Sequence, residues 1–135
     1  MEGGKFGLII IPNLKRKPTY MKNFRSLSFW SMSKEFAVEI YGATKTFPRS
    51  EQFGLTSQMR RSAVSIPSKI AEGTSRKSDK DFSRFLDIAI GSAHELENQL
   101  EIALEIDYLT KDEYNLLHNK LVSITKMIGT YRSKL

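Results

Sequence analysis

The stretch QMRRSAVSIPSKIAEG, residues 58–73, combines a helical apolar period with an internal proline. Apolar side chains recur at intervals of three and four residues, which predicts an amphipathic helix starting near Thr56; they are Leu55, Met59, Ala63, Ile66 and Ile70. Pro67 has no amide proton for the carbonyl of Ala63, and its ring clashes with that carbonyl, at a cost of about 3 kcal/mol in a straight helix. The sequence therefore predicts a helix that is kinked at Pro67 and ended by a left-handed cap at Gly73.

The segment before this helix carries the same period. It runs from about residue 27 to 46, and its apolar stripe comprises Leu27, Trp30, Phe36, Ala37, Ile40, Tyr41 and Thr44. We expect this helix to end before Pro48, because the residue preceding a proline is disfavoured in the helical region.

Two capping boxes mark the helices that follow residue 73. Ser78 with Asp81 begins one helix: the serine hydroxyl and the aspartate carboxylate are expected to accept hydrogen bonds from first-turn amides reciprocally. We expect this helix to reach Asp107. Thr110 with Glu113 begins the last helix. Four helices with short connections predict an all-α fold, an antiparallel up-down four-helix bundle.

The bundle domain is expected to cover residues 23–135. Residues 1–22 contain three glycines and two prolines without a sustained period, so we interpret them as an irregular, disordered N-terminal arm. Met21 opens the better patterned segment, and we interpret it as the natural start of the protein.

Composition excludes several classes of protein. With 135 residues, of which 40% are hydrophobic and 27% charged, the chain is typical of one globular domain. No apolar run approaches the roughly 20 residues that span a bilayer. There is no cysteine for a disulfide or a thiolate site. Glu2 stands where a signal peptide has basic residues, so we do not expect export. Together with the lack of a long apolar run, this predicts a cytoplasmic protein without a membrane segment.

The charge distribution is uneven. The net charge is +6, yet residues 85–109 contain acids and no lysine or arginine. Glu97, Glu101 and Glu105 repeat at four-residue spacing, where like charges repel, so we expect a basic partner within the chain or across a subunit boundary. The candidates are Lys120, Lys126, Arg60, Arg61 and Lys69. A solvated acidic face is the alternative.

Small residues on the same helix favour close helix packing. Gly91 and Ser92 would let a neighbouring helix approach, either inside the bundle or from another subunit. Together with the three glutamates, they are the candidate inter-helix or oligomer contacts.

No pattern in the sequence indicates a catalytic or metal-binding site. The sequence HELEN, which begins at His94, lacks the second histidine of a zinc protease, and no Glu-x-x-His pair of a di-iron bundle is present. Ser123 and Lys126 match S-x-x-K without the companion motifs of penicillin-binding enzymes. We therefore expect a protein that is not an enzyme and that needs no cofactor.

Nucleic-acid binding has a positive case. Lysine and arginine can neutralise phosphates and release counterions, which gives affinity without sequence readout. The candidate nucleic-acid-binding residues are Arg60, Arg61, Lys69, Arg76, Lys77, Lys80 and Arg84. The alternative is that Arg60 and Arg61 pair with the acidic helix while the others are solvated charges. Because most aromatic residues lie on apolar stripes, we expect mainly electrostatic binding.

Several stretches resemble a known family. LTSQMRRSAVSIPSKIAEG, then FLDIAIGSAHELENQLEIA and DYL, together with the earlier RSLSFWSMSKEFAVEIYGATKTFP, are similar to the four-helix-bundle proteins encoded in intervening sequences of bacterial 23S rRNA genes. Lys69 stands where the family usually has asparagine. The resemblance implies a homopentamer around a central opening, without established catalytic activity. More distantly, the chain resembles accessory factors of diversity-generating retroelements, which implies nucleic-acid binding through basic surfaces.

Taken together, these observations predict a non-enzymatic, oligomeric helical bundle that binds RNA or DNA through its basic surface. The alternative is a structural or protein-interaction ring whose basic surface serves an acidic protein partner.

Overall fold

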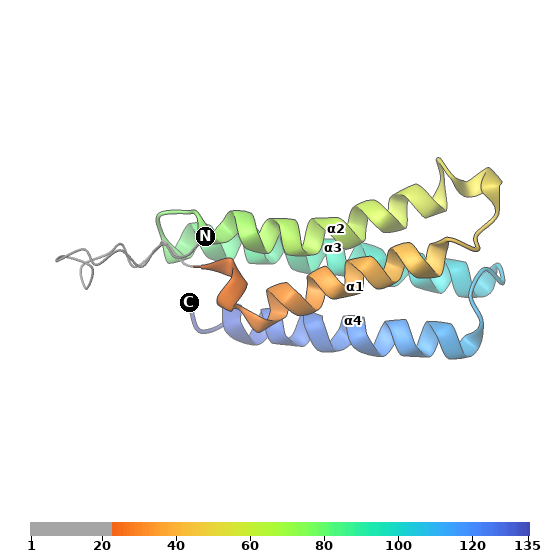
Figure 1. Ribbon diagram of the computed structural model, residues 1–135. Helices are drawn as coiled ribbons and strands as arrows, with labels where there is room; N and C mark the ends of the chain where they lie inside the picture. Colours follow the sequence, from red (N-terminus) through yellow and green to blue (C-terminus); the bar gives the residue numbers. More distant parts are fainter. Residues whose placement is uncertain (1–22) are drawn as a thin grey trace.

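Four α-helices make up most of residues 23–135, the part of the chain that the computed structural model describes (Figure 1). They are α1 (Ser28–Thr44), α2 (Leu55–Thr74), α3 (Asp79–Glu105) and α4 (Lys111–Arg132), with short 3-10 turns η2 (Phe24–Ser26) and η3 (Arg49–Glu51). These described residues contain no strand. The prediction of four helices is confirmed, with bounds that differ by about two residues. The arm and the start site predicted within residues 1–22 lie outside the described residues.

The helices run up and down in sequence, so that α1 packs against α2 and α4, and α3 packs against the same two helices from the opposite corner. The connection between α2 and α3 lies at the same end of the bundle as the C-terminus (Figure 1). The connections from α1 to α2 and from α3 to α4 lie at the opposite end. The apolar stripes meet in one core whose fully buried side chains include Phe36, Ile40, Met59, Ile66, Ile70, Leu86, Leu96, Leu100, Leu121, Ile124 and Ile128.

The seam between α2 and α3 is the most extensive contact in the bundle. The hydroxyls of Ser65 and Ser92 are 2.8 Å apart across it. A Cβ atom at Gly73 would lie 2.8 Å from Cδ1 of Phe82 and 2.8 Å from Cβ of Phe85. The predicted left-handed cap at Gly73 is wrong, because α2 continues to Thr74. The glycine instead makes room for the phenylalanines of α3.

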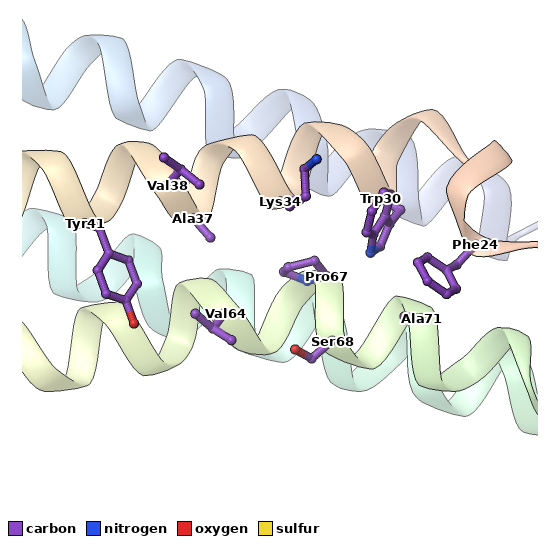
Figure 2. Close-up of a pocket in the computed structure, with 10 residues that line it drawn as sticks. All are labelled: Phe24, Trp30, Lys34, Ala37, Val38, Tyr41, Val64, Pro67, Ser68 and Ala71. Atoms are coloured by element: carbon purple, nitrogen blue, oxygen red, sulfur yellow. The ribbon is translucent and has the colours of Figure 1, made fainter. Parts of the chain in front are cut away.

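The seam between α1 and α2 is more open. α2 runs as one α-helix through the buried Pro67. Beside Pro67, the two helices leave an apolar groove of about 430 Å³, lined by Phe24, Trp30, Lys34, Ala37, Val38, Tyr41, Val64, Pro67, Ser68 and Ala71. Figure 2 shows Trp30 and Tyr41 projecting from α1 toward α2 at separate points along this groove.

The two predicted capping boxes have different outcomes. At Thr110 both arms form, since the Thr110 hydroxyl accepts from the Glu113 amide and the Glu113 carboxylate accepts from the Thr110 amide. At Ser78 the hydroxyl accepts from the amide of Asp81 at 3.1 Å, but the carboxylate of Asp81 binds two arginines instead of returning to Ser78. The reciprocal half of that prediction is therefore wrong.

Candidate nucleic-acid interface

One end of the bundle holds the connection from α2 to α3 together with the C-terminus (Figure 1). The sequence places many basic residues in the segments that meet there. We call this the basic end. Among the described residues its cations are Arg25, Lys69, Arg76, Lys77, Lys80, Arg84, Arg132 and Lys134, and its carboxylate side chains are Glu72, Asp79, Asp81 and Asp87. At the opposite end, carboxylates outnumber cations, because Glu51, Glu105, Asp107, Asp112 and Glu113 accompany Lys45, Arg49 and Lys111.

Two arginines of the basic end share one aspartate. Arg76 Nε donates to Asp81 Oδ2 at 3.2 Å, and Arg84 donates to Asp81 Oδ1 through Nε at 3.1 Å and through a terminal nitrogen at 3.0 Å. Both guanidinium groups lie over the ring of Phe85, with their central carbons 5.0 and 4.7 Å from its centroid. The hydrogen bonds from Arg76 and then from Arg84 lower the pKa of Asp81. One carboxylate thus holds two cations in a fixed position.

A second pair extends the basic end to α4. Arg132 donates to both carboxylate oxygens of Asp87, at 2.8 and 3.0 Å, and this hydrogen bonding lowers the pKa of Asp87. A polar groove of about 560 Å³ lies between the two helices, lined by Ser78, Lys80, Asp81, Ser83, Arg84, Asp87, Arg132 and Leu135. Its lining combines three cations, Lys80, Arg84 and Arg132, with the carboxylates of Asp81 and Asp87.

The contributions of Arg25, Arg132 and Lys134 were missed by the sequence reasoning, which considered only cations that are close together in the chain. The topology could have found them. In an up-down bundle, the first helix begins and the fourth helix ends beside the connection from the second to the third.

Lys77 and Lys80 are exposed, and neither forms an ion pair with another residue in 23–135. They flank Ser78, in the connection to α3 and in its first turn. Such unpaired ammonium groups are free to exchange their counterions for phosphates.

The other predicted binding residues lie elsewhere or are engaged. Arg60 faces α1, where Nε donates to Thr44 Oγ1 at 2.9 Å and a terminal nitrogen donates to the Tyr41 carbonyl at 3.2 Å. Its guanidinium carbon lies 4.6 Å from the centroid of the Tyr41 ring. Arg61 is exposed beside a polar groove between α2 and α3. Lys69 pairs with Glu72 at 3.3 Å. The structure thus separates Arg60 and Arg61 from the basic end.

The acidic segment, residues 85–109, has few basic partners among the described residues. Glu97 lies 2.8 Å from His118 Nε2, and that ring stacks on Tyr114. Burial and the charges of Glu101 and Glu97 raise the pKa of Tyr114. Among the cations proposed to face the glutamates, Lys120 pairs with Glu39 of α1 instead. Within residues 23–135, no ion pair joins Glu101 or Glu105 to a lysine or arginine.

The two small residues on α3 differ. Ser92 is buried and contacts Ser65 across the seam, as an inter-helix contact should. Gly91 is exposed, and a Cβ atom there would meet nothing within 4 Å, so it serves no close approach inside the described chain.

Across residues 23–135, no group of three histidine or carboxylate side chains is arranged to hold a metal ion. None of the helices in this range combines the length and the apolar character needed to cross a membrane.

Comparison with known proteins connects this fold to a family. The family model described as 23S rRNA-intervening sequence protein matches residues 25–130. A crystal structure of a protein of unknown function from the S23 ribosomal protein family of Bacteroides thetaiotaomicron is similar, with a TM-score of 0.70 and 30% sequence identity over 77% of this chain and 97% of that one. No curated protein matches. Since the family model covers most of the bundle, the chain belongs to the 23S rRNA-intervening sequence protein family.

Proposed function

We propose that this protein is a non-enzymatic, self-associating helical bundle that binds RNA or DNA through the electrostatics of its basic end. One observation carries the proposal: cations from η2, the α2–α3 connection and the end of α4, far apart in sequence, converge at one end of the bundle. The more distant resemblance to retroelement accessory factors supports the same function.

The resemblance implies five copies around a central opening. Such a ring repeats each basic end by symmetry, which multiplies the number of phosphates that one assembly contacts. A bend at Pro67 would adapt α2 to this arrangement. We place the assembly in the cytoplasm.

A binding experiment tests the proposal. Fluorescence anisotropy with labelled structured RNA and duplex DNA, at several salt concentrations, should show binding that weakens steeply as salt rises. The double variant Lys77→Gln with Lys80→Gln should weaken binding and lower the salt slope by about 2 per bound chain. The matched control, Lys45→Gln with Lys111→Gln, makes the same change in net charge at the opposite end and should bind like the native protein. Absence of binding at low salt would contradict the proposal, and equal losses in the two variants would remove the basic end as the site.

The alternative, a scaffold ring that binds an acidic protein, is favoured by the arginines that are already engaged. Arg76, Arg84 and Arg132 each bind an aspartate, which leaves less charge for phosphate. A protein that forms an oligomer but binds neither RNA nor DNA would favour this alternative.

A further inference from the structure

We infer that the apolar groove between α1 and α2 of one copy receives the exposed face of α3 from a second copy. This inference rests on the self-association proposed above and names the two surfaces that make it. The exposed face of α3, which we call the α3 ridge, comprises Ile88, Gly91, Glu95, Asn98, Ile102 and Glu105, all of them exposed.

The groove exposes apolar side chains that the bundle does not need to expose for its own packing. Val38 is 67% exposed, Tyr41 43% and Val64 41%. In Figure 2, Trp30 and Tyr41 reach across from α1, and Pro67 lies between them on α2. A contiguous apolar surface of this kind is typical of a contact with another molecule.

The groove also carries positive charge. The Lys34 ammonium lies 5.3 Å from the centroid of the Trp30 ring, and the Arg60 guanidinium lies 4.6 Å from that of Tyr41. Trp30 and Tyr41, two of the three aromatic residues of the groove, therefore each have a cation beside the ring. An approaching surface with apolar and acidic side chains would complement both.

The α3 ridge has this composition. Ile88 is 39% exposed and Ile102 42%. Within residues 23–135, neither Glu95 nor Glu105 forms an ion pair. Ile88 and Ile102 are 14 positions apart, about 21 Å along a helix, a length comparable with the roughly 17 Å from Trp30 to Tyr41. The unpaired carboxylates of the acidic segment thereby acquire partners in a second copy.

Gly91 gives the ridge a close point of approach. Since a Cβ atom there would meet nothing within 4 Å among residues 23–135, glycine costs the helix about 1 kcal/mol relative to alanine without any gain in the described bundle. A backbone without a side chain, one turn from Ile88 near the N-terminal end of the ridge, lets a second bundle come near, as small residues do where helices pack closely.

The groove and the ridge are different surfaces, so the contact is heterologous. α3 packs against α2 and α4, and its exposed face points away from α1, which forms one wall of the groove. A heterologous contact leaves a groove free at one end of a pair and a ridge free at the other, and repetition closes a ring when the rotation permits.

Two single variants test the contact, with mass measured by sedimentation. Gly91→Gln places a side chain on the ridge without disturbing its own bundle, and Val38→Glu places a charge in the groove at a mostly exposed position. Each variant should sediment as a single chain of 15.4 kDa with unchanged helical circular dichroism. Gly129→Gln is the matched control on α4, because a Cβ atom there also meets nothing within 4 Å among residues 23–135, and it should keep the native mass.

Mixing the two variants gives the most specific outcome. The ridge of Val38→Glu and the groove of Gly91→Gln remain intact, so an equimolar mixture at high concentration should form pairs and nothing larger. A native protein that sediments as a single chain contradicts the self-association itself. A native oligomer whose mass survives Gly91→Gln and Val38→Glu contradicts this docking arrangement alone, as do variants that dissociate but fail to pair when mixed.

Discussion

The two seams of α2 show two ways in which one helix can meet its neighbours. Against α3, small residues bring the backbones together, and Gly73 leaves room for Phe82 and Phe85. Against α1, Trp30 and Tyr41 stand between the helices, and an apolar groove stays open. The closed seam contributes stability because its surfaces are complementary within one chain. The open seam gives up part of that stability and keeps an apolar surface for contact with another molecule.

The largest expected effect comes from filling the closed seam. Gly73→Leu forces a side chain against Phe82 and Phe85, so we expect the free energy of unfolding in urea to fall by about 3 kcal/mol. Gly129→Leu, at a helical glycine with open space beside it, should be neutral or gain up to about 1 kcal/mol from helix propensity. Equal effects would mean that the close approach at Gly73 does not limit stability.

The adjacent arginines of α2 should differ in their effect on stability. Arg60 closes one end of the open seam with two hydrogen bonds and a cation–π contact, so Arg60→Ala should cost about 1–2 kcal/mol. Arg61 is exposed, and Arg61→Ala should stay within about 0.5 kcal/mol of the native protein. Thermal unfolding of both variants measures the difference. A larger loss for Arg61→Ala would show that the α1–α2 seam does not depend on Arg60.

Acid should destabilise the connection between α1 and α2, which contains Glu51. The Leu55 amide and then the Tyr108 hydroxyl donate to Glu51 and lower its pKa. A carboxyl whose pKa is lower in the folded state stabilises the protein above its unfolded value of about 4.3 and loses that contribution as the pH falls through the folded value. We therefore expect Glu51→Gln to show a smaller loss of melting temperature below about pH 4 than the native protein. Identical acid profiles would contradict this.

Much of the fold could be predicted from sequence because it depends on local periodicity. The stripes placed all four helices, and the box of Thr110 with Glu113 formed as expected. The error at Gly73 has a physical cause. A glycine near a helix end can form a left-handed cap or make room for a close contact, and here the positions of Phe82 and Phe85 show that it makes room for a contact. Tyr41, on the expected core stripe, is 43% exposed because it lies at the open seam.

The candidate site was harder to predict. Arg60 and Arg61 are neighbours in sequence, yet successive residues on a helix point about 100° apart, so they face different helices. Conversely, Arg84 and Arg132 are distant in sequence and line one groove. Closeness in sequence therefore wrongly grouped Arg60 with Arg61 and failed to group Arg84 with Arg132. The arrangement of the helices determines which side chains lie together.

The separation of charge along the bundle has a consequence for kinetics. A cationic end and an end rich in carboxylates, separated by the length of the helices, give the protein an electric dipole along its long axis. Near a polyanion, this dipole orients the basic end toward the polyanion before contact. Ionic strength should therefore change the rate of association more than the rate of dissociation. In a ring with cyclic symmetry, the components along the rotation axis add, and one side of the assembly meets the polyanion first.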